Sequence, residues 1–216
     1  MESSEKRPSL IDYYRRRAGE YEAIYAKPER QSDLLLLKKK LTELLKNARV
    51  LEVACGTGYW TTVIANAAGT VTATDLAEEP MNIARAKAFP KKNVTFVEAD
   101  AYALPEGLGR FDAAFAGFWW SHVPRERIAQ FVASLHARLE PGARVLLLDN
   151  LYVGGNSTPV SEVDSAGNTY QLRTLADGSS FRVMKNYPTK DELRALLPSP
   201  VHYRALQYYW LAEYKL

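Results

Sequence analysis

The central part of this 216-residue chain alternates between short apolar runs and stretches with helical spacing. The apolar runs cover residues 49–53, 70–74, 94–98, 111–116 and 143–149. The helical stretches lie between them, at residues 59–67, 78–88 and 125–139. Apolar strands connected by helices are typical of a parallel sheet that is covered on both faces. We therefore expect an α/β fold of the Rossmann-like, doubly wound type, and the length suits a single domain.

The N-terminal part departs from this alternation. Residues 9–26 place Tyr14, Tyr21 and Tyr25 at spacings that would bring them to one face of a helix. A second helix is expected over residues 32–46, with Ser32 as its N-cap. Its buried stripe is expected to consist of Leu34, Leu37, Leu41 and Leu44.

The C-terminal part also departs from it. Extended runs at 168–175 and 181–186 flank a loop that contains Gly178, which predicts a β-hairpin. Thr189 is placed to cap a short helix, and two closely spaced strands within 203–215 can pair only in antiparallel fashion. The expected sheet is seven-stranded and mainly parallel with an antiparallel C-terminal strand, together with N-terminal helices and a β-hairpin lid.

Composition narrows the classes of function. The formal net charge of +3 does not indicate a nucleic-acid-binding surface. Cys55 is the only cysteine, so no intrachain disulfide or cysteine metal cluster can form, and we expect no metal site. We expect Cys55 to have a packing role. No apolar run is long enough to cross a bilayer and the first residues do not form a secretory signal, so a cytoplasmic protein without membrane contact is expected.

The segment VLEVACGTGYW, residues 50–60, contains a strand followed by a glycine loop. In doubly wound folds such a loop lies at the carboxyl edge of the sheet, where ligands bind. Gly56 and Gly58 allow the backbone to approach a ligand closely. The dinucleotide-binding pattern requires a third glycine, but Thr61 stands at that position. The loop is therefore not typical of a dinucleotide site.

Two acidic residues end the next two predicted strands. Asp75 lies at the end of the second strand, where a carboxylate can accept hydrogen bonds from both hydroxyls of a ribose. Asp100 ends the third strand at the same edge of the sheet, where an adenine amino group could be recognised. A single strand-end aspartate can equally be a helix cap. The two aspartates together with the glycine loop favour a ligand that contains adenosine.

With these residues the chain resembles the class I S-adenosylmethionine-dependent methyltransferases of the small-molecule type, most closely over residues 49–148. The resemblance implies that Glu52 supports the ammonium end of the cofactor, that Asp75 binds its ribose, and that Asp100 and the amide of Ala101 recognise its adenine. Many members have glycine where this chain has Ala54. S-adenosyl-L-methionine is the implied cofactor and S-adenosyl-L-homocysteine the implied product.

The resemblance further places Leu76 and Met81 on either side of the adenine ring and Phe118 beside the cofactor. It also places an N-terminal tyrosine over the cofactor, although simple packing of the tyrosines is the alternative. The implied cofactor-binding residues are Tyr14, Tyr21, Glu52, Ala54, Gly56, Gly58, Trp60, Asp75, Leu76, Met81, Asp100, Ala101 and Phe118. The segment 139–142 resembles the family's turn between a helix and the fifth strand. The implied organisation is a helical cap (1–47), a cofactor-binding core (48–150), a hairpin lid (151–188) and a C-terminal helix with strands (189–216).

The methyl acceptor requires alignment with the donor, and a general base only if it must lose a proton. His122 is the candidate base, and its alternative role is to brace the following helix. Of Trp119 and Trp120, at most one is expected to line the acceptor pocket, because adjacent side chains point in different directions. We expect this to be Trp119, with Asn150 and Tyr152 adding polar contacts.

The sequence therefore predicts a methyltransferase that transfers a methyl group to an oxygen, nitrogen or carbon atom of a small-molecule acceptor by in-line displacement. Two other hypotheses stay open. One is an RNA or protein methyltransferase, which the pI near 8.8 allows although no basic stripe stands out. The other is a cofactor-binding subunit without catalytic activity. The protein is expected to be a monomer or a homodimer.

Overall fold

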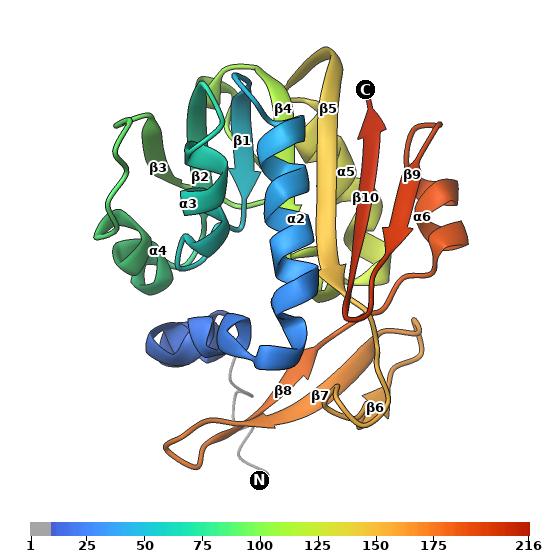
Figure 1. Ribbon diagram of the computed structural model, residues 1–216. Helices are drawn as coiled ribbons and strands as arrows, with labels where there is room; N and C mark the ends of the chain where they lie inside the picture. Colours follow the sequence, from blue (N-terminus) through green and yellow to red (C-terminus); the bar gives the residue numbers. More distant parts are fainter. Residues whose placement is uncertain (1–9) are drawn as a thin grey trace, which may run out of the picture.

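The computed structural model describes residues 10–216 and is built around a seven-stranded sheet of order β3-β2-β1-β4-β5-β10-β9. Strands β1 to β5 are parallel, and β10 is antiparallel to both of its neighbours. The carboxyl ends of the parallel strands β1 to β5 lie at the lower edge of the sheet in Figure 1. The fold class predicted from the sequence is confirmed. The strands are β1 (Arg49–Val53), β2 (Thr70–Asp75), β3 (Val94–Glu98), β4 (Phe111–Gly117), β5 (Leu139–Asn150), β9 (His202–Ala205) and β10 (Tyr209–Lys215).

Helices cover both faces of this sheet. Side chains of β5 alternate between two hydrophobic clusters, because Val145 and Leu147 face one side and Leu146 and Leu148 the other. One cluster includes residues of α2 and α3, and the other includes residues of α5 and α6. The helices are α1 (Leu10–Arg17), α2 (Gln31–Leu44), α3 (Tyr59–Ala65), α4 (Glu78–Arg85), α5 (Ile128–His136) and α6 (Lys190–Leu196).

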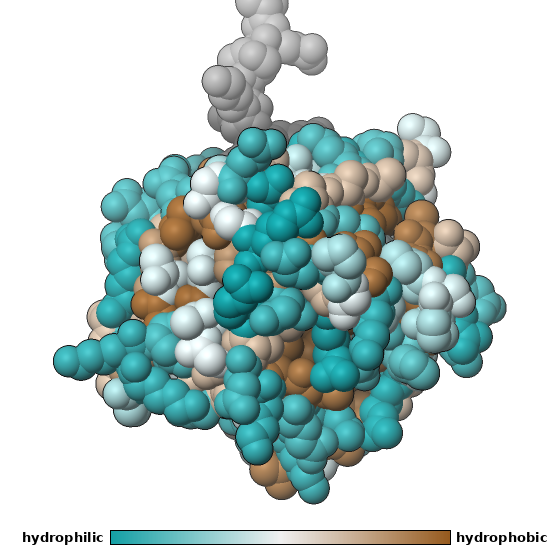
Figure 2. All heavy atoms as spheres, turned by 90° about the horizontal axis from the view of Figure 1, so that it is seen from above, coloured by the Kyte–Doolittle hydropathy of each residue, from teal (hydrophilic) through white to brown (hydrophobic). Residues whose placement is uncertain are grey.

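Short 3₁₀ helices connect several of these elements. They are η1 (Ala18–Ala26), η2 (Pro28–Arg30), η3 (Glu106–Leu108), η4 (Trp120–His122) and η5 (Arg125–Arg127). Seen from above, the face at the amino ends of the parallel strands is mostly hydrophilic, with apolar residues interspersed (Figure 2).

The N-terminal segment is not the single helix that the tyrosine spacing predicted. Helix α1 ends at Arg17 and continues as η1, so the three tyrosines do not share one helical face. Their rings nevertheless meet, because the centroids of Tyr14 and Tyr21 lie 5.8 Å apart and those of Tyr21 and Tyr25 lie 6.1 Å apart. The aromatic cluster therefore forms by a change of helix type rather than by helical periodicity.

Several boundaries also differ from the sequence predictions, since α3 and α4 end earlier than expected, at Ala65 and Arg85. Helix α2 begins at Gln31 without a side-chain cap, and Leu45 rather than Leu44 completes its fully buried stripe. Helix α5 ends at His136, and the segment 139–142, predicted as a turn, lies within β5. Thr189 caps α6 with a complete capping box, as predicted.

A second sheet lies below the carboxyl edge of the first (Figure 1). It consists of β6 (Glu162–Val163), β7 (Thr169–Thr174) and β8 (Ser180–Met184), all antiparallel. Strands β7 and β8 form the predicted hairpin, and β6 is an addition that the sequence did not indicate. The hairpin packs against α1, with the rings of Tyr13 and Phe181 5.5 Å apart.

Candidate cofactor and acceptor site

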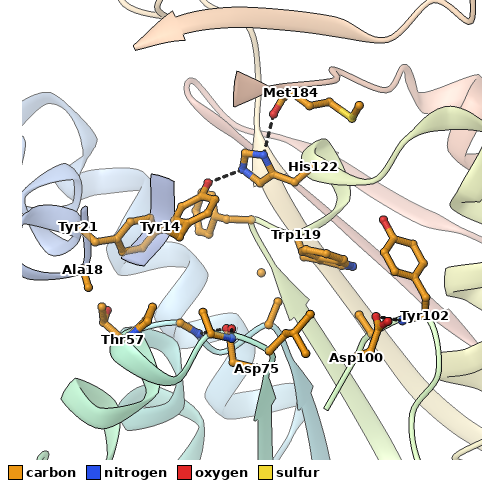
Figure 3. A pocket seen from close by; sticks show the side chains of 18 of the residues that line it. Tyr14, Ala18, Tyr21, Thr57, Asp75, Asp100, Tyr102, Trp119, His122 and Met184 are labelled. Carbon is orange, nitrogen blue, oxygen red and sulfur yellow. Dashed lines mark hydrogen bonds between the residues drawn. The ribbon is translucent and has the colours of Figure 1, made fainter. Parts of the chain in front are cut away.

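A first cavity of about 490 Å³ lies at the carboxyl ends of β1 to β4, between α1 with η1 and strand β8 (Figure 3). Ligands bind at this edge in open α/β sheets. Most residues that the sequence analysis singled out line this cavity. They are Tyr14, Tyr21, Ala54, Gly56, Asp75, Leu76, Asp100, Ala101, Phe118, Trp119 and His122.

Four of the predicted cofactor residues do not line the cavity. Met81 is fully buried below it, and Pro80 of the same helix takes its place in the lining. Trp60 is buried in the core, where its indole N–H donates to the hydroxyl of Tyr25 at 3.2 Å. Glu52 and Gly58 are also outside the lining. Successive side chains of a helix point in different directions. The position of Met81 in the sequence therefore did not show that its neighbour Pro80 faces the cavity instead.

The two glycines of the loop have different roles. A Cβ added to Gly58 would lie 2.8 Å from the Cβ of Ala84, so glycine is needed there for close packing of the loop on α4. A Cβ added to Gly56 would meet nothing within 4 Å, and this residue lines the cavity. Close approach to a ligand is therefore open at Gly56, whereas Gly58 serves the packing of the fold.

Asp75 joins the glycine loop to the start of α4. One carboxylate oxygen accepts a hydrogen bond from the amide of Gly56 and the other from the amide of Ala77, both at 2.8 Å. Each oxygen retains a second lone pair for a hydroxyl donor. Burial raises the pKa of Asp75 above its usual value, while the bonds from Ala77 and Gly56 lower it.

Asp100 occupies the equivalent place after β3. Its Oδ1 accepts a hydrogen bond from the amide of Tyr102 at 2.9 Å, which fixes the turn that follows. Asp100 and Ala101 both line the cavity, and so does Leu76, the first residue after β2. The aspartates therefore lie at one edge of the sheet, as their strand-end positions predicted.

Glu52 lies beneath the loop with 2% of its surface exposed. Its Oε2 has no hydrogen-bond partner among residues 10–216, and burial raises the pKa of the carboxyl to about 8. An unsatisfied buried oxygen is costly, so a donor from a bound ligand would stabilise it. This orphaned acceptor suits a cofactor with a cationic end, but Glu52 does not line the cavity.

His122 is buried and both of its ring nitrogens have partners (Figure 3). Nδ1 lies 2.7 Å from the carbonyl oxygen of Met184, and Nε2 lies 2.7 Å from the hydroxyl of Tyr14. A carbonyl can only accept, so Nδ1 carries the proton and Nε2 accepts the hydrogen bond from Tyr14. Burial, followed by the nearby charges of Lys185 and Arg173, lowers the pKa of His122 well below its usual value. The imidazole is therefore neutral near pH 7.

A second cavity of about 700 Å³ lies between η1, the hairpin and the end of β5. Four residues line both cavities and form the wall between them, namely Tyr14, Tyr21, Phe118 and His122. We call these four residues the shared wall. Asn150 lines the second cavity, and its contact with the acceptor stays a prediction. Tyr152 lines neither cavity; it is 48% exposed and packs against Tyr187.

The two adjacent tryptophans point in different directions. Trp119 lines the first cavity and its ring lies 5.8 Å from that of Tyr102, whereas Trp120 is buried in the core. Trp119 was expected to line the acceptor pocket, but it lines the first cavity and is absent from the wall of the second. Cys55 is buried, and burial raises the pKa of its thiol well above the usual value, which suits a packing role.

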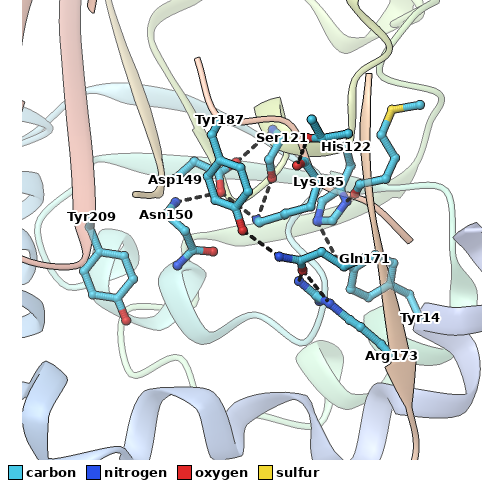
Figure 4. A network of polar contacts seen from close by, with 12 residues as sticks. Tyr14, Ser121, His122, Asp149, Asn150, Gln171, Arg173, Lys185, Tyr187 and Tyr209 are labelled. Atoms are coloured by element: carbon cyan, nitrogen blue, oxygen red, sulfur yellow. Dashed lines mark hydrogen bonds and ion pairs between the residues drawn. The ribbon is translucent and has the colours of Figure 1, made fainter. Parts of the chain in front are cut away.

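The sequence analysis missed a buried polar network at the end of β5 (Figure 4). Lys185 Nζ lies 2.8 Å from Asp149 Oδ1 and donates to the hydroxyl of Ser121 at 2.6 Å. The amide of Ser121 donates to the other oxygen of Asp149 at 2.9 Å. Asp149 ends a strand at the ligand-binding edge just as Asp75 does, and this position is the signal that could have identified it.

Two features are absent from residues 10–216. No cluster of three or more His, Cys, Asp or Glu side chains in this range could hold a metal ion. No helix in the same range is both long and apolar enough to cross a membrane.

The fold and the site define a Rossmann-like α/β protein with a ligand site built on a glycine loop and two strand-end aspartates. Residues 50–142 match the model of a family described as a methyltransferase domain. The chain is also similar to curated demethylmenaquinone methyltransferases of Staphylococcus aureus, with 33% identity over 107 residues. That match covers 48% of this chain and 44% of the relative, so the chain matches less than half the length of these relatives.

Similar solved structures extend over nearly the whole chain. A DhpI–SAH complex is 29% identical with a TM-score of 0.76, and the match covers 94% of this chain and 93% of that one. A DhpI–SAM–HEP complex gives 28% identity and a TM-score of 0.77, with 94% of each chain covered. The glycopeptide N-methyltransferase MtfA, complexed with sinefungin, shares the fold at 21% identity with a TM-score of 0.60, over 82% of this chain and 92% of MtfA.

The methyltransferase-domain match over residues 50–142, the similar SAM- and SAH-bound structures and the demethylmenaquinone methyltransferase relatives all support a class I S-adenosylmethionine-dependent methyltransferase.

Proposed function

We propose that this protein uses S-adenosyl-L-methionine to methylate an oxygen, nitrogen or carbon atom of a small molecule. The observation that carries the proposal is the shared wall between two cavities at the carboxyl edge of the sheet. One cavity has the glycine loop with Asp75 and Asp100, and the other is larger and more polar. Such a pair suits a donor and an acceptor that meet at the wall. The complexes of similar structures with SAM and SAH support the cofactor.

The residues of the first cavity suit the parts of this cofactor. Asp75 has free lone pairs for ribose hydroxyls, and Asp100 with the amide of Ala101 can bind the adenine edge. Leu76 and Pro80 supply apolar contact to a flat ring. When bound, S-adenosyl-L-methionine supplies an activated methyl group.

The shared wall would align and deprotonate the acceptor. The tyrosines and Phe118 exclude water from the junction, which favours a defined approach of the acceptor to the first cavity. His122 Nε2 is an unprotonated acceptor whose lone pair is directed at the Tyr14 hydroxyl. We therefore propose that a proton leaving the acceptor is taken by the Tyr14 oxygen while the tyrosine proton passes to His122. In this proposal His122, the candidate base in the sequence, acts through Tyr14 rather than directly.

Cofactor binding tests the site assignment. Asp75→Asn keeps the shape of the side chain and removes its charge, so we expect at least about tenfold weaker binding of S-adenosyl-L-methionine by calorimetry. Asp191→Asn, on the exposed surface of α6, is the matched control and should bind like the wild type. Equal affinity of Asp75→Asn and the wild type would refute the assignment.

Turnover tests the catalytic part of the proposal. Transfer of labelled methyl groups to a metabolite panel distinguishes an enzyme from a binding-only subunit. With an accepted substrate, Tyr14→Phe and His122→Ala should each reduce turnover by about 10²-fold or more, which is typical for the loss of general base catalysis. Full turnover of either variant would exclude that residue from the proton path.

A further inference from the structure

Basic side chains dominate the wall of the second cavity. One acidic residue contributes to this wall, the exposed Glu20. The basic residues of the wall are Arg17, Lys27, Arg30, Arg173 and Lys185. The first cavity differs, because Asp75 and Asp100 balance its two arginines. The excess of positive charge is therefore specific to the second cavity.

Little of this charge is neutralised by the protein itself. Lys185 is paired with the buried carboxylate of Asp149. Within residues 10–216, Arg17 and Arg173 form no ion pair with a carboxylate. Cations that converge on a cavity without a counter-ion repel one another, and an anion placed among them removes that repulsion.

Arg173 is held in place by neutral partners (Figure 4). Its Nε and Nη2 donate to the side-chain oxygen of Gln171 at 3.1 and 2.7 Å, and its Nη1 donates to the hydroxyl of Tyr13 at 3.4 Å. Gln171 is itself fixed, because its amide nitrogen donates to the carbonyl of Thr158 and to the hydroxyl of Tyr187. A guanidinium has five N–H donors, so two remain after these three bonds. Arg173 is thus oriented in advance with donors to spare.

Arg17 approaches the same region from α1. Its guanidinium carbon lies 5.5 Å from the centre of the Tyr13 ring, and that of Arg173 lies 6.0 Å from the same centre. The two guanidinium groups therefore converge on one aromatic ring at the edge of the cavity. The positive charge of both arginines also acts on His122 in the shared wall. The pKa of His122 is lowered first by burial and then by the charges of Lys185, Arg173 and Arg17.

We infer that the second cavity is a binding site for an anionic group of the methyl acceptor, a carboxylate or a phosphorus or sulfur oxyanion, held by Arg173 and Arg17. The assignment of this ligand as the acceptor rests on the proposed function. A planar guanidinium with two free donors matches the two oxygens of such a group. The cavity also adjoins the shared wall, so a molecule anchored at Arg173 has its other end within the region of Tyr14 and His122.

Anion binding by the purified protein tests the inference without any need for turnover. The protein saturated with S-adenosyl-L-homocysteine is titrated with inorganic phosphate, sulfate and acetate at constant ionic strength, and binding is followed by calorimetry. We expect saturable binding of at least one of these anions, and the stronger of phosphate and acetate indicates the class of anionic group. Heats that do not saturate, or that chloride reproduces, overturn the inference.

Three variants locate the site. Arg173→Gln and Arg17→Gln should each weaken anion binding at least tenfold. The guanidinium of Arg17 makes no hydrogen bond to residues 10–216 and only packs over the rings of Tyr13 and Tyr21, so its variant keeps the test valid if loss of Arg173 disturbs the Gln171 network. Arg204→Gln, on the exposed surface of β9, is the matched control and should bind anions like the wild type. Unchanged affinity in both cavity variants contradicts the inference.

Matched acceptor pairs separate this inference from the proposed function. The pairs are carboxylic acids with their amides and phosphate monoesters with their parent alcohols, each offered with labelled S-adenosyl-L-methionine. Methylation of the charged members that is lost in Arg173→Gln supports both ideas. Methylation of neutral members alone overturns the anionic acceptor while the methyltransferase stands. Arginine-dependent anion binding without methylation of any compound supports the anion site and counts against the proposed function.

Discussion

Alternate residues of the loop after β1 have left-handed backbone conformations, with φ of 56° at Ala54, 55° at Gly56 and 76° at Gly58. Glycine adopts such angles freely, whereas an L-residue with a Cβ pays about 1 kcal/mol or more. Ala54 therefore stores strain in the wall of the first cavity, at the position where many members of the family have glycine. The loop therefore adopts a backbone conformation that is unfavourable for Ala54.

This strain makes Ala54→Gly a test of the loop. Glycine removes the left-handed penalty but also increases the entropy of the unfolded chain, so we expect unfolding free energy within about 0.5 kcal/mol of the wild type or above it. The same substitution at Ala133, exposed in α5, should cost about 1 kcal/mol. Urea denaturation compares the two variants. An equal loss at both positions would show that Ala54 is not strained.

Glu52 gives a second prediction at the residue scale, which concerns pH. Its pKa rises from an ordinary value of 4.5 to about 8 in the folded protein, so between these values the folded chain holds a proton that the unfolded chain has released. Stability therefore falls as pH rises through this window, by at most about 1.4 kcal/mol per pH unit. Denaturant unfolding is measured for the wild type and for Glu52→Gln at pH 5 to 8. The unfolding free energy of the wild type should fall relative to that of Glu52→Gln as pH rises, because glutamine does not titrate. Parallel pH curves would refute the raised pKa.

At the scale of the elements, one buried ion pair connects the second sheet to the first. Lys185 follows β8 and Asp149 lies in β5, and their side chains are 4% and 0% exposed. The imidazole of His122 adds a second connection, because it bonds to the last residue of β8. The N-terminal segment has a connection of its own, because the carboxylate of Glu22 in η1 accepts a hydrogen bond from the hydroxyl of Thr57 in the glycine loop at 2.6 Å. The hairpin and the N-terminal segment are thus fixed to the site by polar contacts.

Breaking the ion pair should loosen the hairpin. Lys185→Met leaves the carboxylate of Asp149 buried without its cation, which typically costs about 3–5 kcal/mol. The double variant Lys185→Met with Asp149→Asn removes both charges and should recover part of that loss. Chemical denaturation measures both effects. If the double variant is less stable than Lys185→Met alone, uncompensated charge is not the cause of the loss.

The elements also show what could be predicted from the sequence. The five parallel strands and the capping box of α6 depend on local spacing, and they lie where the sequence indicated, apart from the earlier start of β5. Lys185 and Asp149, in contrast, are 36 residues apart, and Arg173 contacts Tyr13 over a separation of 160 residues. Such contacts follow from the three-dimensional packing of the hairpin on α1, which no local pattern encodes. The basic second cavity was therefore beyond sequence reasoning, whereas the strand-end aspartates were not.

At the scale of the whole molecule, three distant parts of the chain enclose the candidate site. They are the N-terminal segment α1 with η1, the carboxyl ends of β1 to β4, and the hairpin of β7 and β8. The hydrogen bond that His122 accepts from Tyr14 and the one that it donates to Met184 connect all three at the shared wall. A ligand in the first cavity contacts residues of each part, so its binding should stabilise them together.

Hydrogen exchange tests this coupling. A ligand at 100 times its Kd stabilises the folded state by about 2.7 kcal/mol, which slows exchange wherever opening exposes the site. With saturating S-adenosyl-L-homocysteine we expect slower amide exchange in α1 and η1, in the loop after β1, and in β8. Segments α6 and β9, at the far edge of the sheet, provide the internal reference and should change less. Protection confined to the loop after β1 would mean that the N-terminal segment and the hairpin open independently of the cofactor and do not act as a lid.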